Sequence, residues 1–285
     1  MTALEQHRHH PRTFHDNRFV YPVLSRRSQG LSVGINLNPD KVCNFDCIYC
    51  QVDRTSQAET RFVELDAVLE ELDDLLAMAT DGSLWEDPSF AEVPVSLRRL
   101  NDIAFSGDGE PTTYRNFDEI VERVGEVKTR RGCEDAKLVL ITNASMFHRP
   151  AVERGLETLH AHNGEIWAKL EAGTDEYYRL IERTVVPFGR VLENIAAAAR
   201  RWPVVIQSLF MRVQGEAPPE SEIDAFCDRL CEITTSGGQL QLVQVYTVAR
   251  PPAESFVTAL DDQELQEIAS RVQARCGLAT AVFGG

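Results

Sequence analysis

The sequence predicts an α/β protein in which parallel strands alternate with helices. Six apolar runs of strand length are separated by segments of helical spacing, and parallel strands need helical crossovers. The strands have two different faces, since Lys169 and Glu171 alternate with apolar residues along the segment 166–171. Strands of an open doubly wound sheet are apolar on both faces, so a polar face favours a barrel around a polar ligand.

The predicted strands follow from alternation of apolar and polar residues, and the predicted helices from apolar residues spaced three to four apart. Residues 31–38 alternate strictly between apolar and small polar side chains, which is typical of a strand with two faces. Pro150 favours a helix that begins there, because proline suits the first helical turn. By the same reasoning we expect six main strands at 31–38, 102–106, 138–142, 166–171, 204–211 and 240–247, followed by a closing strand at 279–283. We expect helices at 65–76, 116–128, 150–159, 174–183, 188–201, 221–232 and 263–275.

Length and composition set the domain organisation. The chain has 285 residues, of which 43% are hydrophobic and 26% charged, which excludes a disordered tail, a collagen-like chain and a disulfide miniprotein. We expect a flexible N-terminal extension at 1–20 and a core domain at 21–285. No run of about 18 apolar residues occurs. We therefore expect no membrane partner, no secretory signal and a cytoplasmic location.

The charge is strongly acidic and uneven. Lys and Arg number 29 against 44 Asp and Glu, a net charge of −15, which opposes a positive field over the whole surface and excludes DNA as an expected partner. Residues 1–30 are basic, with five arginines against Glu5 and Asp16. A solvated, frayed terminus is favoured there over a nucleic-acid-binding arm.

Three of the seven cysteines lie together between the first strand and the first helix, as Cys43-x₃-Cys47-x₂-Cys50. Thiolates this close either converge on a metal or repel one another. A structural zinc site needs a fourth ligand, yet the next Cys or His is Cys133. A four-iron cluster on three thiolates fits better, because its fourth iron stays open for a substrate or cofactor.

The loop, with the aromatic Tyr49 before its last cysteine, resembles that of the radical S-adenosylmethionine (SAM) superfamily. The resemblance implies a partial (βα)6 barrel and a [4Fe-4S] cluster on Cys43, Cys47 and Cys50. It implies SAM at the open iron, cleaved reductively to a 5′-deoxyadenosyl radical that abstracts hydrogen from a substrate. This metal-binding oxidoreductase chemistry needs an external electron donor of the flavodoxin or ferredoxin type.

A second segment, Gly107-Asp108-Gly109-Glu110-Pro111, resembles the family's GGEP segment, which binds the SAM amino group. Glycine lets the backbone approach a ligand closely, and Glu110 supplies negative charge near an ammonium. The family usually has Gly where this chain has Asp108. Taken alone, the segment would be a tight Gly-Pro turn.

Polar residues at the carboxyl ends of later strands complete the expected site. Barrel enzymes hold ligands at those ends, and the resemblance implies groups there for the ribose, carboxylate and adenine of SAM. A structural hydrogen bond is the alternative for each residue. With Tyr49 on the loop, the candidates are Asn143, Lys169, Glu171, Gln207 and Thr247.

A finer resemblance covers residues 20–255, carried by PVLSRR at 22–27, KLEAG at 169–173 and YTVARPP at 246–252. It is to the stand-alone bacterial and archaeal group related to wyosine-synthesising tRNA enzymes. It makes a tRNA base the first substrate class to consider. The open alternatives are a radical SAM activase, a peptide modifier, and a non-catalytic Fe–S or zinc-binding protein.

The match to wyosine synthases is incomplete. Those enzymes carry a second cluster on cysteines that precede the radical SAM loop, and no cysteine precedes Cys43 here. They also use a lysine Schiff base. Of the four lysines of this chain, Lys169 and Lys41 are the candidate catalytic residues, while Lys128 and Lys137 are expected on or beside a surface helix.

The remaining cysteines are Cys133, Cys227, Cys231 and Cys276. Cys227 and Cys231 are four residues apart and share one helix face. Cysteine packs as a small hydrophobe, so buried thiols are favoured over an auxiliary cluster.

Overall fold

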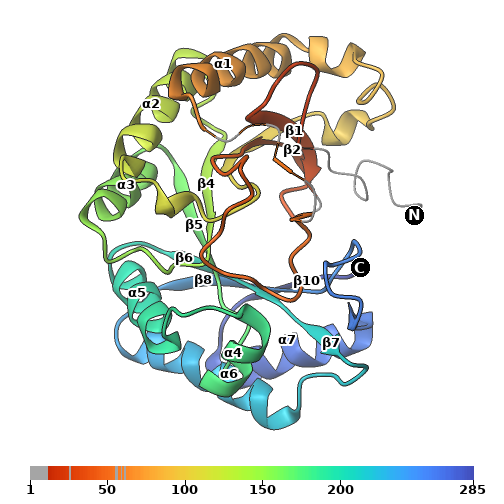
Figure 1. The fold of residues 1–285 in the computed structure, drawn as a ribbon, viewed down its shortest axis with the longest axis vertical. Coiled ribbons are helices and arrows are strands. Elements are labelled where there is room, and N and C mark those ends of the chain that lie inside the picture. Colours follow the sequence, from red (N-terminus) through yellow and green to blue (C-terminus); the bar gives the residue numbers. More distant parts are fainter. Residues whose placement is uncertain (1–11, 26, 55–56, 59, 61) are drawn as a thin grey trace. The chain divides into compact units, whose positions relative to one another are not determined.

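The computed structural model describes residues 12–25, 27–54, 57–58, 60 and 62–285 (Figure 1). The chain forms two compact units. The first comprises Met1–Val42, Gln57–Ile141 and Arg149–Glu165, and the second comprises Cys43–Ser56, Thr142–His148 and Ile166–Gly285.

The first unit contains a sheet in the order β1-β2-β3-β4 with three α-helices. β1 runs antiparallel to β2, while β2, β3 and β4 are parallel. Its strands are β1 Val20–Ser25, β2 Gly30–Ile35, β3 Leu100–Phe105 and β4 Lys137–Thr142. Its helices are α1 Leu65–Asp81, α2 Phe117–Arg130 and α3 Pro150–Ala161, with 3₁₀ turns η2 Ser83–Glu86, η3 Val95–Leu97 and η4 Pro111–Thr113.

The second unit holds parallel strands in the order β5-β6-β8-β10 and a two-stranded antiparallel sheet of β7 and β9. Helices follow β5 and β6, as the sequence predicts. The strands are β5 Gly164–Lys169, β6 Val204–Leu209, β7 Met211–Val213, β8 Leu240–Tyr246, β9 Val257–Ala259 and β10 Thr280–Phe283. The helices are α4 Asp175–Glu182, α5 Phe188–Arg201, α6 Glu220–Thr235 and α7 Asp262–Cys276.

Close helix packing in the first unit depends on small residues. α2 and α3 approach one another where Gly155 lies against the Phe117 ring, so that a Cβ at Gly155 would lie 2.6 Å from it. Val152, Leu156 and Leu159 bury the inner face of α3 completely or nearly so, at the three- and four-residue spacing of a helix. Apolar spacing read from the sequence therefore identifies the face that packs.

The structure adds one strand to the predicted elements and changes two of them. Val20–Ser25 was not predicted as a strand; Pro22, which lacks an N–H, is tolerated there because β1 ends the sheet order. The predicted strand 204–211 splits at Phe210, which is buried and donates its N–H to Tyr246 O at 2.8 Å. The predicted strand 166–171 ends at Lys169, which leaves Glu171 in the following loop.

Lys128 is also placed differently from the prediction. It lies on α2 but is only 2% exposed. Its Nζ donates to Glu134 O at 3.1 Å and to His162 O at 2.9 Å. Backbone carbonyls thus satisfy the ammonium inside the protein, where the residue type alone predicts exposure.

The described part of the predicted extension is packed. Phe14 and Phe19 are buried, and the Glu71 carboxylate on α1 accepts the N–H groups of Arg18, Phe19 and Val20 at 2.8–3.0 Å. Residues 1–11 lie outside the described residues, and the boundary at residue 20 stays a prediction.

No helix among the described residues combines the length and apolarity needed to cross a bilayer.

Candidate functional site

The cysteine loop, residues 43–50, is fastened to the end of α4. Asp46 N donates to Glu182 O at 3.1 Å, and Ile48 N donates to Ile181 O at 2.9 Å. Thr184 Oγ1 donates to the loop carbonyl of Asn44 at 2.9 Å. The path of this short, irregular loop is therefore set by backbone contacts rather than by secondary structure of its own.

The segment that leads into α4 is fixed from α6. Glu222 on α6 is buried, and its carboxylate accepts the N–H groups of Gly173 and Thr174 at 2.5 Å and 3.2 Å. Thr174 then caps α4 by accepting the N–H of Tyr177 at 3.2 Å. A Cβ at Gly173 would lie 2.1 Å from Phe226 N, so only glycine fits this close approach.

The three thiols have different neighbours. Cys47 Sγ donates to Glu182 Oε2 at 2.7 Å, whereas Cys50 Sγ accepts from Arg54 Nη2 at 3.7 Å. Burial raises the pKa of Cys47, and the Glu182 carboxylate raises it further. Burial lowers the pKa of Arg54, but the charges of Cys50 and Cys43 outweigh that effect and leave it raised. The loop therefore pairs one thiol with an acid and two with a base.

The donor chemistry of the loop fits an iron–sulfur cluster. Cys43, Cys47 and Cys50 are all half-buried thiols, and Cys50 N donates to Cys47 O at 3.0 Å in a tight turn. In the described part of the chain no three metal-binding side chains already gather at one point. The fit rests on three soft sulfur donors without a fourth nearby.

Buried charges lie beside the loop in the same unit. Tyr49 Oη donates to Glu182 Oε1 at 3.2 Å, and Lys169 Nζ lies 5.5 Å from the Tyr49 ring centroid. Burial raises the pKa values of both Glu171 and Glu182, and the charge of Glu182 raises that of Glu171 further. Burial alone lowers the pKa of Lys169, but Tyr246 and Glu171 raise it well beyond its ordinary value. Lys169 is therefore an ammonium, and one ammonium faces two carboxyl groups.

One acceptor in this group has no partner. Glu171 is 3% exposed, and its Oε1 makes no hydrogen bond. A buried carboxylate oxygen without a donor is costly, so this atom needs a further donor, which a bound molecule or an ordered water would supply. A hydroxyl or ammonium group of a bound molecule would satisfy it. This is the observation in the second unit that most favours a small polar ligand.

The glycine segment, residues 107–111, lies in the first unit. A Cβ at Gly107 would lie 2.2 Å from Asn36 Oδ1, and one at Gly109 would lie 2.2 Å from Val42 O. Asp108 accepts from Asn36 Nδ2 at 2.6 Å and forms an ion pair with Arg12. The two glycines therefore pack closely against neighbouring residues of the first unit, and Asp108 is held on both sides. The expected approach of their backbone to a ligand stays a prediction.

Glu110 and Pro111 begin the short turn η4. Glu110 is buried, and its Oε1 accepts the backbone N–H of Thr112 at 3.2 Å and the Thr112 hydroxyl. Pro111 occupies the first position of the turn, where its missing N–H costs nothing. The Glu110 carboxylate thus caps its own turn, and its expected contact with an ammonium stays a prediction.

The other expected SAM residues take part in hydrogen bonds within the second unit. Asn143 Nδ2 donates to Asn44 Oδ1 of the cysteine loop at 2.9 Å. Gln207 Nε2 donates to Gln244 Oε1 at 3.1 Å, and Thr247 Oγ1 accepts Leu260 N at 2.9 Å. These contacts match the structural alternative, and the ligand roles stay predictions.

The two candidate catalytic lysines have different settings. Lys169 lies among the buried acids of the second unit, while Lys41 forms a turn in the first, with φ of 62° and its backbone N–H donating to Asn38 O at 2.9 Å.

Glu182 and Arg54 are site residues that the sequence did not reveal. Glu182 contacts Cys47 across 135 residues, and no local pattern marks it. Arg54 had a signal, since it follows Cys50 by four residues.

The family model of the radical SAM superfamily matches residues 91–226. This match covers a little under half of the chain and supports a radical SAM enzyme, without specifying its reaction. The matched residues follow the cysteine loop at 43–50 in the sequence and include the glycine segment at 107–111.

Three relatives put the match in context. A protein named GTPase Obg from Brachyspira hyodysenteriae is 21% identical over 266 residues, or 92% of this chain and 34% of that protein; the chain thus spans about a third of its length. A radical SAM methyltransferase from Sphaerobacter thermophilus has a TM-score of 0.64 at 12% identity, over 93% of this chain and 69% of that one. The structure of TYW1 with a lysine-pyruvate adduct bound has a TM-score of 0.48 at 16% identity, over 85% and 73% of the two chains.

The methyltransferase likeness concerns the fold alone. It extends over nearly the whole chain and confirms the predicted fold class, an α/β partial barrel of the radical SAM type.

Proposed function

We propose that Cys43, Cys47 and Cys50 bind one [4Fe-4S] cluster, and that the chain binds SAM beside it and cleaves it reductively. The observation that carries this proposal is the grouping, in one unit, of three thiols on a fastened loop with the unpartnered Glu171 Oε1. Three thiolates leave one iron open, and a buried acceptor offers a hold for a polar ligand.

The residues of the chain have separate tasks in this scheme. When bound, the cluster supplies the electron that breaks a C–S bond of SAM and yields a 5′-deoxyadenosyl radical. Glu171 accepts a hydrogen bond from a hydroxyl or amino group of SAM, and Lys169 offsets the charge of the two buried carboxyl groups. Tyr49 is 3% exposed and helps to exclude water from the thiols.

The role of the glycine segment, which lies in the first unit, is proposed from the family resemblance alone. The backbone of Gly107 and Gly109 lies in tight contact with neighbouring residues, and such backbone is already in place before a ligand arrives. Its polar atoms would hold the SAM amino group, as the family resemblance implies. An external flavodoxin- or ferredoxin-type carrier supplies the electron.

We propose a tRNA base as the substrate class, on the resemblance to tRNA enzymes over residues 20–255. The net charge of −15 opposes broad phosphate contact. Arg12 pairs with Asp108 and Arg18 with Glu64, so two of the N-terminal arginines are already neutralised. The proposal therefore needs a local contact with one exposed nucleotide rather than a basic binding surface.

Reductive cleavage is tested on the anaerobically reconstituted chain. Incubation with SAM and a strong reductant should yield 5′-deoxyadenosine, and the Cys47→Ala variant should yield none. An intact cluster that produces no 5′-deoxyadenosine would overturn the proposal. Modified nucleosides of tRNA from wild-type and deletion strains test the substrate; identical profiles would exclude tRNA and favour a peptide or protein substrate.

A further inference from the structure

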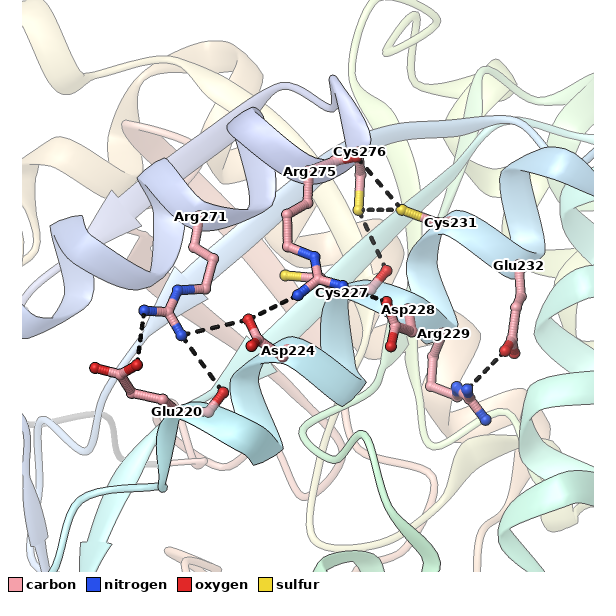
Figure 2. A network of polar contacts seen from close by, with 10 residues as sticks. All are labelled: Glu220, Asp224, Cys227, Asp228, Arg229, Cys231, Glu232, Arg271, Arg275 and Cys276. Carbon is pink, nitrogen blue, oxygen red and sulfur yellow. Dashed lines mark hydrogen bonds and ion pairs between the residues drawn. The ribbon is translucent and has the colours of Figure 1, made fainter.

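Two cysteines meet where α6 and α7 pack against each other. Figure 2 shows Cys231 on α6 and Cys276 at the end of α7 pointing toward one another, with their Sγ atoms 2.6 Å apart. Cys276 Sγ also contacts Cys227 O at 3.2 Å, and Cys231 Sγ contacts Arg275 O at 3.7 Å. Both residues are half-buried, so a small reagent can reach them.

Ion pairs between the helices hold this register. Arg275 lies 2.8 Å from Asp224 and 2.6 Å from Asp228, and Arg271 lies 3.4 Å from Asp224 and 3.6 Å from Glu220 (Figure 2). Such a network adds geometric restraint even where each exposed pair is weak. Since Arg275 directly precedes Cys276, the network positions the thiol pair.

The other free thiols outside the cysteine loop do not extend the pair into a metal site. Cys227 is fully buried on α6, and Cys133 is buried in the first unit. Within the described ranges no three side chains of the Cys, His, Asp and Glu types are grouped to hold a metal ion. Two adjacent thiols without a third ligand favour pairing with one another.

We propose that Cys231 and Cys276 form a reversible disulfide when the protein meets a small-molecule disulfide such as oxidised glutathione. The inference is independent of the proposed cluster and SAM chemistry, because it uses none of those residues. It assigns α6 and α7 a covalent modification site.

The reaction is thiol–disulfide exchange in two steps. The Cys231 thiolate attacks the oxidant, which forms a mixed disulfide and releases one thiolate. The Cys276 sulfur, after losing its proton, attacks Cys231 Sγ and releases the second. Two protein thiols are oxidised and one small disulfide is reduced to two thiols. Burial raises the pKa of Cys276, and the adjacent Cys231 raises it further, so Cys276 loses its proton less readily than a free thiol and is assigned the second attack. Equilibration takes minutes to hours.

The disulfide would close the chain between residues 231 and 276, which includes β8, β9 and most of α7. Closing a loop of this size restricts the unfolded chain. The expected result is a rise in Tm of roughly 5 to 10 °C for the oxidised protein.

The test uses the full-length reconstituted protein under anaerobic conditions, equilibrated with mixtures of reduced and oxidised glutathione. Free thiols are then blocked with N-ethylmaleimide, and peptides are identified by mass spectrometry. A peptide linking Cys231 to Cys276 should accumulate as the oxidised share increases. Complete alkylation of both residues in every mixture, or a link from either to Cys227, would overturn the proposal.

Variants supply a second readout. Cys231→Ala should abolish both the linked peptide and the oxidation-dependent rise in Tm. The matched control Cys133→Ala should keep both, since Cys133 lies in the other unit. A rise in Tm that persists in Cys231→Ala would contradict the proposal, and the wild-type peptide measurement stands even where a variant does not fold.

Discussion

The cysteine loop and the glycine segment differ in how far the polar side chains around them are paired. Beside the loop, Lys169 faces two buried carboxyl groups, and Glu171 Oε1 has no partner. In the glycine segment, Asp108 is paired with Arg12 and Asn36, and Glu110 bonds to Thr112.

The contrast indicates which region needs a ligand to become complete. A satisfied segment is rigid before anything binds and costs little to order. The residues beside the cysteine loop have more carboxyl groups than ammonium groups and one acceptor without a donor, so a ligand that supplies a donor would stabilise the protein. We therefore expect substitutions near the cysteine loop to act on cofactor content and charge, and those in the glycine segment to act on backbone packing.

Cys47→Ala, in the cysteine loop, should produce the largest effect of these variants, a loss of iron. Two thiolates hold a cubane poorly, so iron content should fall from about four per chain to below about one. Iron and sulfide quantitation after anaerobic reconstitution measures this, with Cys133→Ala as the control that keeps its iron. Unchanged iron in Cys47→Ala would show that the ligand set is wrong, and about eight irons in the wild type would indicate a second cluster.

Gly109→Ala tests the close backbone packing of the glycine segment. Its Cβ would lie 2.2 Å from Val42 O and 2.8 Å from Asn38, so the backbone must move, at a cost of about 3 kcal/mol of unfolding free energy. SAM affinity should fall at least roughly tenfold (about 1.4 kcal/mol), with iron content unchanged. Calorimetry and urea unfolding measure both. Gly189→Ala is the control, because nothing lies within 4 Å of its Cβ; equal losses in both variants would contradict the packing argument.

Lys169→Met tests the charge balance beside the loop. Removing the ammonium leaves Glu171 and Glu182 with less compensation, and the unfolding free energy should fall by about 2 kcal/mol. The double variant Lys169→Met/Glu171→Gln should recover part of the loss, because it removes one of the two carboxylates. Chemical unfolding of the four proteins forms a double-mutant cycle. Additive losses would mean that the lysine and the glutamate are not coupled.

Arg54→Met should change the cluster without removing it. The guanidinium lies 3.7 Å from Cys50 Sγ, and positive charge near the sulfurs favours the reduced state. The midpoint potential should drop on the order of 50 mV, about 1 kcal/mol for one electron, as measured by a redox titration followed by electron paramagnetic resonance. Arg190→Met, which removes an arginine paired with Glu193 on α5, is the control. An unchanged potential in Arg54→Met would remove Arg54 from the site.

Asp73→Asn sets the scale of an ordinary ion pair and should have the smallest effect. Hydrogen bonds from Arg131 lower the pKa of Asp73 in the folded state, so its contribution is present above the unfolded pKa and is lost as pH falls through the folded one. Because the Asp73 side chain is 24% exposed, the variant should lose at most about 1 kcal/mol at pH 7. Thermal unfolding from pH 7 down to about pH 3 should show the two proteins converging; a constant difference would exclude a charge effect.

Features carried by residues close together in the sequence could be predicted, whereas contacts between residues far apart in the sequence could not. The alternating elements and the three cysteines stand in local patterns, so spacing alone identifies them. Glu182 meets Cys47 across 135 residues, and its position at the end of an amphipathic helix is that of many exposed glutamates. Lys128 is buried for a similar reason, because its carbonyl partners come from a turn and from residue 162. β1 was not predicted; it contains Pro22, which a strand tolerates at the edge of a sheet, and an edge position is not visible in the sequence.

The bond between Arg12 and Asp108 links two positions that are 96 residues apart and limits how each can vary. The resemblance to the GGEP segment implies glycine where this chain has Asp108, and the charge of Asp108 is offset by Arg12 and by the Asn36 amide. Losing the arginine alone would leave an acid beside the glycine turn, and losing the acid alone would leave a half-buried cation. The two positions should therefore change together as sequences diverge, so that lineages with glycine at position 108 have no electrostatic reason to retain arginine at position 12.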